Sequence, residues 1–195
     1  MKKDSPVFHS FFICFVAASL VFITSCEPKF EEPYTIYTIP KGTHGQSLRI
    51  ETLQKDEMVF KVVFDESAIY ETADPVNQHD LNKLAGFADC NSHHHENSAR
   101  FGWRWLDGQL EIHAYVYHSG IRTSGFMGMV GINQAHDYRI SLEDNSYVFQ
   151  LDNLTEVRIT RENNCNMGVY YKLWPYFGGD EVSPHDIKIK ILEER

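Results

Sequence analysis

Apolar and polar side chains alternate with a period of two along most of the chain, and turn residues recur at short intervals. This pattern is typical of antiparallel β-strands. The most regular example spans residues 138–142 and 147–151, which flank Asp144-Asn145. A two-residue turn there places one set of apolar side chains on a single face: Tyr138, Ile140, Leu142, Tyr147, Phe149 and Leu151. A shift of one residue would turn this set toward solvent, so the pattern also predicts the register.

Asp107-Gly108 is the strongest turn signal in the chain, because both residues tolerate the positive φ of a two-residue type I′ turn. One face of the resulting hairpin pairs Trp105 with Leu110, Trp103 with Ile112, Phe101 with Ala114 and Ala99 with Val116. This face is apolar, and we expect it in the core. The opposite face pairs Arg104 with Glu111, Gly102 with His113 and Arg100 with Tyr115, and Tyr117 follows in the same row.

Other segments extend the pattern. Residues 48–53 and 58–64 flank a polar turn at Lys55-Asp56, and residues 185–191 alternate isoleucine with charged side chains. Residues 74–87 favour a short helix, with a proline near the start and Gly86 near the end. Many short strands predict an all-β fold, an antiparallel two-sheet sandwich of the jelly-roll type with one short helical segment. A closed antiparallel barrel is the alternative.

Residues 1–25 predict a secretory signal, because two lysines precede an apolar stretch shorter than the ~20 residues of a transmembrane helix. Its end, Ile-Thr-Ser before Cys26, resembles the lipobox of bacterial lipoproteins. The resemblance implies a signal peptide over residues 1–25, lipidation of Cys26 and a lipid-anchored tether over residues 26–33. A single β-sandwich domain would then span residues 34–195. A lipid holds a protein on a membrane without spanning it; an ordinary cleaved signal is the alternative.

The formal net charge of −9 argues against nucleic acid as a partner, since nucleic acid requires a basic surface. This charge is still compatible with a local basic pocket for an acidic ligand. Cys90 and Cys165 remain in the predicted domain, in a compartment where a disulfide can form. Two free thiols are the alternative.

The polar face of the hairpin is the candidate site. Tyrosines stack on sugar rings and donate hydroxyl hydrogen bonds, and arginine binds carboxylates through paired hydrogen bonds. Gly102 leaves room above the imidazole of His113. We therefore expect a carbohydrate or another envelope ligand to bind, without chemistry, to Arg100, Arg104, Glu111, His113, Tyr115 and Tyr117. A plain solvated face with an Arg104–Glu111 ion pair is the alternative.

In residue types, this row resembles the concave face of jelly-roll polysaccharide lyases. The resemblance implies an alternative function, β-elimination of a uronic-acid glycan, with His113 as the base and Tyr115 or Tyr117 as the acid. The chain lacks the RSELR-like and YFKAG-like strands of alginate lyases with that architecture, which argues against an enzyme. It also lacks the G-x-S-x-G elbow of serine hydrolases and the glycine-rich loops that bind nucleotide cofactors.

The run His93-His94-His95-Glu96 offers ligands for zinc. Neighbouring side chains of an extended segment point to opposite faces, so at most two of the three imidazoles, those of His93 and His95, would converge. We expect a loop of hydrogen-bonding histidines and no resident cofactor, with zinc as the alternative. Asp180 and Glu181 offer oxygen ligands for calcium, but we expect the aromatic residues around 174–177 to close one end of the sandwich there.

Two stretches, PYFGGDEVSPHDI over residues 175–187 and NSARFGWRW with LEIHAYVY in the hairpin, resemble a group of Bacteroidetes envelope lipoproteins. The resemblance implies a concanavalin-like β-sandwich in the cell envelope, anchored by lipid to the outer membrane on its periplasmic or surface face. Its partner would be a glycan or an envelope protein. A third possible function is a non-catalytic accessory subunit that contacts another protein of an envelope complex through the same aromatic-rich face.

Overall fold

The structure, a computed structural model, describes residues 33–45, 51–161 and 170–194. The predicted signal peptide, Cys26 and Cys165 lie outside these residues, and the predicted domain boundaries stay a prediction. Within the described residues, no helix has the length and apolarity needed to cross a membrane.

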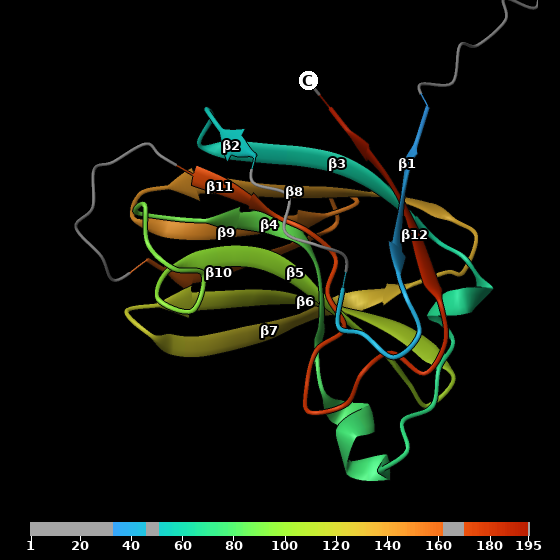
Figure 1. The fold of residues 1–195 in the computed structure, drawn as a ribbon. Helices are drawn as coiled ribbons and strands as arrows, with labels where there is room; N and C mark the ends of the chain where they lie inside the picture. Colours follow the sequence, from blue (N-terminus) through green and yellow to red (C-terminus); the bar gives the residue numbers. More distant parts are fainter. Residues whose placement is uncertain (1–32, 46–50, 162–169, 195) are drawn as a thin grey trace, which may run out of the picture. The chain divides into compact units, whose positions relative to one another are not determined.

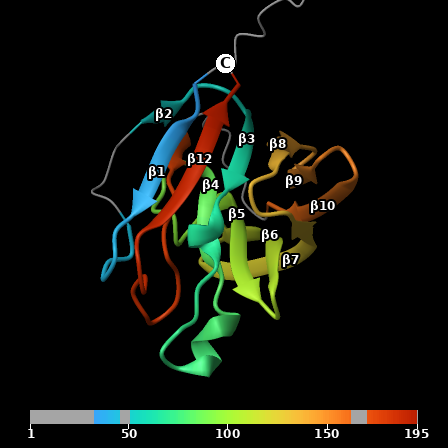
Figure 2. The same ribbon diagram turned by 90° about the vertical axis from the view of Figure 1, so that its right-hand side faces the viewer.

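Two antiparallel six-stranded sheets pack face to face (Figures 1 and 2). Sheet A contains, in spatial order, β1 (Thr35–Ile39), β12 (Ile187–Glu193), β3 (Glu57–Phe64), β8 (Ala135–Glu143), β9 (Ser146–Leu151) and β10 (Thr155–Thr160). Sheet B contains β2 (Thr52–Leu53), β11 (Tyr170–Leu173), β4 (Asn82–Ala88), β5 (Ser98–Leu106), β6 (Gln109–His118) and β7 (Ile121–Val130). The predicted two-sheet sandwich is confirmed. The barrel alternative is wrong, because neither sheet closes on itself.

The core between the sheets is rich in aromatic side chains. Phe101 on β5 contacts Phe60 on β3 and Tyr138 on β8, with ring centroids 5.9 and 4.9 Å apart. Trp103, also fully buried, packs against Phe64 of sheet A at 5.2 Å. Truncating one such side chain typically costs about 3–5 kcal/mol. These contacts fix sheet B on sheet A and determine which face of sheet B points outward.

The hairpins predicted around Asp107-Gly108 and Asp144-Asn145 are confirmed. Strands β8 and β9 have the predicted register around Asp144-Asn145, and β5 and β6 have it around Asp107-Gly108. Asp144 and Asp107 adopt φ values of 46° and 51°, the left-handed region that a type I′ turn requires. The three isoleucines of β12 lie in the core, as the alternation predicts.

The predicted helix over residues 74–87 is wrong beyond its first turn. A 3-10 helix, η2 (Pro75–His79), follows Asp74, whose carboxylate accepts a hydrogen bond from a backbone amide of the helix. It lies at one end of the sandwich (Figure 2). The chain then forms β4, whose register against β5 shifts between Lys83 and Gly86. Such a bulge adds a residue and breaks the period-two alternation by which a strand is recognised in a sequence.

The hairpin expected around Lys55-Asp56 is also wrong, as the described residues 51–53 and 58–64 show. Strand β2 pairs with β11 in sheet B, whereas β3 pairs with β8 and β12 in sheet A. The polar residues around Lys55-Asp56 therefore connect the two sheets instead of closing a hairpin. A second 3-10 helix, η1 (Glu66–Ala68), follows β3.

Candidate functional site

The β5–β6 hairpin places the predicted site residues on the outer face of sheet B. Phe101 and Trp103 are fully buried on its inner face, and side chains alternate along a strand, so the residues between them point outward. The outer pairs are those predicted: Arg100–Tyr115, Gly102–His113 and Arg104–Glu111. We use the name Arg100 face for the surface formed by these six residues together with Tyr117, with Lys83 of β4 and with Arg122 of β7.

Arg100 is almost completely covered. The residue is 6% exposed, its Nε is buried without a hydrogen-bond partner, and no ion pair of Arg100 is found in the described part of the chain. Its guanidinium lies 5.7 Å from the ring centroid of Tyr115, within cation–π range. Burial lowers the pKa of Arg100 to about 10, which still leaves the guanidinium charged at neutral pH. The Arg100 face thus holds a buried positive charge that no described acidic side chain neutralises.

Gly86 allows β4 to approach Arg100 closely. A Cβ at Gly86 would lie 2.1 Å from the carbonyl oxygen of Ala99 and 2.4 Å from the Cα of Arg100, so only glycine fits. Gly102 differs, because a Cβ there would meet Tyr115 and His113 at the ordinary contact distances of 3.5 and 3.6 Å. Gly102 therefore leaves room beside His113, as predicted, although packing does not require a glycine.

Sequence reasoning missed Lys83, which brings a second cation to the Arg100 face. Strand β4 pairs Lys83 with Gly102, and its Nζ lies 5.1 Å from the ring centroid of Tyr115. Burial, together with the nearby charges of Arg100 and Arg122, lowers the pKa of Lys83 to about 8. Lys83 therefore keeps most of its charge at pH 7 and loses it above pH 8. Lys83 was missed because a helix was predicted over residues 74–87. Only a strand places Lys83 beside the β5–β6 hairpin.

One end of the Arg100 face is a hydrogen-bonded network. Arg104 donates to Oε2 of Glu111 at 2.7 Å and to the carbonyl of His79 at 2.7 Å, and Nε2 of His113 lies 3.0 Å from the same Glu111 oxygen. Burial raises the pKa of Glu111, but the hydrogen bonds with His113 and Arg104 outweigh it and the net pKa is lowered. Burial lowers the pKa of His113 more than Glu111 raises it. A neutral His113 donating from Nε2 leaves Nδ1 as its basic nitrogen.

Two tyrosines line the middle of the face. The rings of Tyr115 and Tyr117 lie 5.8 Å apart. Burial, with a hydrogen bond to Tyr117, raises the pKa of Tyr115 to about 12, so its hydroxyl stays protonated at neutral pH. Next to them, Phe126 of β7 is 53% exposed and its ring lies 5.4 Å from that of His113. Exposed aromatic side chains of this kind provide contact area for a flat ligand.

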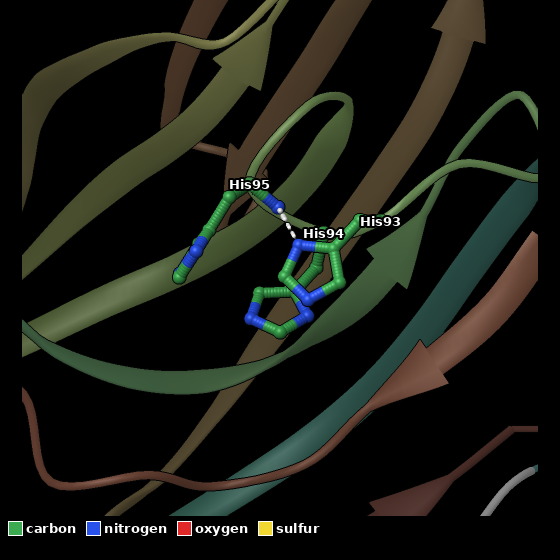
Figure 3. A group of neighbouring side chains, drawn as sticks. All are labelled: His93, His94 and His95. Atoms are coloured by element: carbon green, nitrogen blue, oxygen red, sulfur yellow. Dashed lines mark hydrogen bonds between the residues drawn. The ribbon is translucent and has the colours of Figure 1, made fainter.

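The three histidines converge, contrary to the prediction that at most two would (Figure 3). The chain turns there instead of extending: the amides of Glu96 and Asn97 both donate to the carbonyl of His93, at 2.8 and 3.2 Å. One ligand nitrogen from each of His93, His94 and His95 lies within 4.8 Å of the other two. The prediction failed because it assumed an extended segment.

This histidine loop, residues 93–95, folds over one edge of the Arg100 face. Ser98 donates from Oγ to the carbonyl of His94 at 2.7 Å, and the ring of His95 lies 5.2 Å from that of Tyr117. Burial and the charge of Arg100 lower the pKa of His94 to about 4. Burial also lowers the pKa of His95, with contributions from the other histidines and Arg100. Both imidazoles are therefore neutral at neutral pH.

A buried carboxylate, that of Asp89, anchors the segment that precedes the histidine loop. Asp89 is fully buried, accepts two hydrogen bonds from Arg161 at 2.6 and 3.0 Å, and accepts one from the hydroxyl of Tyr147 at 2.7 Å. Cys90, the next residue, is disulfide-bonded. Its predicted partner Cys165 lies outside the described residues, so that pairing stays a prediction.

The loop after β11 closes one end of the sandwich in part. Phe177 is fully buried and packs on Tyr70 at 5.0 Å, whereas Tyr176 is 42% exposed. The carboxylate of Glu181, a candidate calcium ligand, accepts hydrogen bonds from the amides of Ala73 and Asp74 at 2.8 Å each. This carboxylate therefore holds the segment that leads into η2.

A cavity of about 920 Å³ lies away from the Arg100 face, with a lining that includes Tyr37, Lys172 and Trp174. Of the two lysines in its lining, Lys172 forms ion pairs with Glu51 and Glu193, whereas Lys55 belongs to an exposed turn. Arg100 has no such partner among the described residues. We therefore place the candidate site on the Arg100 face and not in this cavity.

No protein-family model and no curated protein matches the chain. Among solved structures, the alginate lyase AlyC3 is similar, with a TM-score of 0.59 and 10% identity over 83% of this chain and 74% of that chain. An alginate lyase from Klebsiella pneumoniae has a TM-score of 0.52 and 12% identity, over 71% of this chain and 59% of that one. SCLam, a non-specific endo-β-1,3(4)-glucanase of family GH16, has a TM-score of 0.52 and 9% identity, over 83% and 70%. At these identities the likeness establishes the fold alone, a concanavalin-like jelly-roll sandwich.

Proposed function

We propose that this protein is a lipid-anchored cell-envelope protein that binds an acidic glycan on its Arg100 face without chemical change. The observation that carries the proposal is the buried guanidinium of Arg100, which has no acceptor among the described residues. Buried charges in folded proteins are normally paired, and an unsatisfied one calls for an explanation. A ligand carboxylate would supply the missing acceptor, since its geometry matches the paired donors of arginine.

The surroundings of Arg100 suit a sugar acid better than a simple anion. Lys83 adds a second positive charge, the half-buried Tyr117 adds a hydroxyl group beside the buried Tyr115, and Phe126 adds an exposed ring. Sugars are bound in proteins by such combinations of aromatic rings and hydrogen-bonding groups. The fold supports a glycan as the ligand class, because similar structures include AlyC3 in complex with dimannuronate.

Binding without catalysis is favoured by the state of His113, the predicted base. Its Nε2 is already hydrogen-bonded to Glu111, which Arg104 also holds. A base for β-elimination must reach the proton next to the carboxylate. The basic nitrogen of His113 is Nδ1, and the residue is only 7% exposed, which restricts its access to a substrate. The ultraviolet absorbance of unsaturated product, followed while the protein is incubated with polyuronates, tests this directly. A steady increase would replace the binding function with a lyase.

Calorimetric titration tests the binding. Polyuronates, such as polymannuronate and polygalacturonate, should bind, and a neutral β-glucan should not. Arg100→Met should weaken binding at least about tenfold, because hydrogen bonds to charged groups contribute about 1.5–3 kcal/mol. The matched control is Arg158→Met on β10 of sheet A, which is 47% exposed and paired with acidic side chains. Unchanged binding in Arg100→Met would remove this face from the function.

Membrane attachment is tested separately. Metabolic labelling with a radioactive fatty acid should label the full chain at Cys26, and Cys26→Ser should move the protein from the membrane fraction to the soluble fraction. Equal distribution of both forms would show that lipid does not anchor this protein, and would leave the glycan-binding proposal untouched.

A further inference from the structure

The histidine loop offers three nitrogen ligands at one point of the surface. One nitrogen from each of His93, His94 and His95 lies within 4.8 Å of the others, and Figure 3 shows the three rings gathered beside the loop. In a tetrahedral zinc site with Zn–N distances of about 2.0–2.1 Å, ligand nitrogens lie roughly 3.3 Å apart. His93 and His95 are exposed and His94 is half-exposed, so small rotations of these side chains would reduce the separation of the nitrogens from 4.8 Å or less to about 3.3 Å. The backbone need not move.

The backbone of this loop is already fixed. Ser92 donates from its amide to the carbonyl of Asp89 at 3.0 Å, and Gly120 donates from its amide to the carbonyl of Glu96 at 3.0 Å, which ties the loop to the β6–β7 turn. The Asp89–Arg161 ion pair and the disulfide of Cys90 fix the position where the loop begins. A binding site on a fixed backbone loses less conformational freedom when an ion binds, so preorganisation favours binding.

The imidazole nitrogens are available to an ion. No hydrogen bond of the His94 or His95 ring is found in the described part of the chain. Among the described residues, one hydrogen bond reaches a ring nitrogen of this loop. It runs from the amide of His95 to Nδ1 of His93 at 3.3 Å, which is long for a hydrogen bond. Coordination through either nitrogen of His93 would replace this weak contact.

We propose that His93, His94 and His95 form a binding site for one divalent transition-metal ion of the zinc class. Three imidazoles suit zinc, copper and nickel, whereas calcium and magnesium prefer oxygen ligands. The nearby positive charge of Arg100 repels every divalent ion equally, so selectivity would come from the nitrogen ligands alone. Three protein ligands leave a fourth position of a tetrahedral ion for water or an anion. The site lies at the edge of the Arg100 face, but the proposal does not depend on glycan binding.

Equilibrium dialysis of the untagged full chain against Zn²⁺ tests the site. We expect one zinc ion per chain, and no binding of Ca²⁺ or Mg²⁺ under the same conditions. Co²⁺ in place of zinc should give the intense visible absorption of a tetrahedral ion. Each of the variants His93→Ala, His94→Gln and His95→Ala should weaken zinc binding by at least about 10- to 100-fold, the loss typical even for partners outside the first ligand shell.

His79→Ala is the matched control, because it removes an imidazole from η2 without touching the histidine loop. It should bind zinc like the wild type. The proposal is overturned if the wild type binds no zinc at micromolar concentrations, or if the three loop variants bind it as well as His79→Ala does. Circular dichroism of each variant checks that the fold is retained. Titration of the same variants with a polyuronate measures glycan binding separately. A failure of the metal site can then be distinguished from a failure of the glycan site.

Discussion

Replacing Arg100 with methionine should make the unliganded protein more stable, although the same change should weaken ligand binding. In the absence of ligand the guanidinium is buried, and its Nε has no acceptor among the described residues. Such a group has lost its hydration without gaining a partner, which raises the free energy of the folded state. Methionine has a similar length and a flexible apolar chain that fills irregular space. Methionine at position 100 should therefore remove the unfavourable free energy of the buried guanidinium while leaving the sheet intact.

The size of the effect follows from the burial of Arg100. Its pKa is lowered from 12.5 to about 10, which corresponds to roughly 3 kcal/mol of unfavourable free energy for the charged form. The cation–π contact with Tyr115 offsets about 0.5–2 kcal/mol of this. The net gain for Arg100→Met should be about 1–3 kcal/mol, within the range seen when buried ionic groups are replaced by apolar ones. The melting temperature should rise by about 2–12 °C for a chain of this length.

Arg104→Met is the matched control, the same chemical change farther along β5. The guanidinium of Arg104 is satisfied by Glu111 and by the carbonyl of His79, so its loss leaves acceptors without their donor. Arg104→Met should therefore lower stability, by about 1–3 kcal/mol. Urea titrations followed by tryptophan fluorescence measure both changes. If Arg100→Met lowers the midpoint as Arg104→Met does, the guanidinium of Arg100 is stabilising and the reasoning about an unsatisfied charge is refuted.

Three further predictions concern the same sheet. Gly86→Ala should destabilise by about 2–4 kcal/mol because its Cβ would overlap the backbone of β5, whereas Gly102→Ala should cost under about 1 kcal/mol, and thermal melts of the two variants test the difference. Asp89→Asn should destabilise by about 3 kcal/mol in denaturant titrations, since it breaks the ion pair of the fully buried Asp89 with Arg161, whose side chain is 14% exposed. The pKa of Lys83 is about 8 when folded and 10.5 when unfolded, so between these values the unfolded state binds more protons and stability should rise with pH. Affinity for a polyuronate should fall over the same rise in pH as the lysine loses its charge, and Lys83→Met should remove both trends in pH-dependent unfolding and calorimetry.

The parts of the fold that local sequence determines could be predicted. Asp107-Gly108 and Asp144-Asn145 fix tight turns because their residues tolerate positive φ, and the flanking alternation then leaves one register with a buried face. For that reason the turn and the alternation suffice to place Arg100 opposite Tyr115 and Glu111 opposite Arg104. The row of candidate site residues depends on one hairpin, and a hairpin is a local structure.

The features that escaped prediction depend on contacts between distant segments. The register shift between Lys83 and Gly86 removes the regular alternation by which β4 would be recognised, and β5 lies close to β4 at Gly86. Lys83 lies opposite Gly102 because this segment is a strand, so the second cation could not be assigned to the site while the strand was unrecognised. The turn of the histidine loop is held by bonds to neighbouring segments, such as that from Gly120 to Glu96. Neither interaction leaves a periodic signal in the sequence.

The acidic net charge of the chain repels a polyanion, whereas the cationic Arg100 face attracts it. The two effects differ in how strongly they depend on salt concentration. The chain carries a net charge of −9, so at low ionic strength it repels a polyuronate over the Debye length, about 30 Å at 0.01 M salt. At 0.15 M this length falls to about 8 Å, which screens the repulsion, while contact with the buried Arg100 is screened much less. The association rate constant should therefore rise, or stay level, as salt increases over this range. A protein that attracts polyanions with an exposed basic surface loses affinity steeply instead. Stopped-flow measurements at several salt concentrations distinguish the two behaviours, and a steep decrease in the association rate would mean that exposed cations, and not the buried Arg100, attract the glycan.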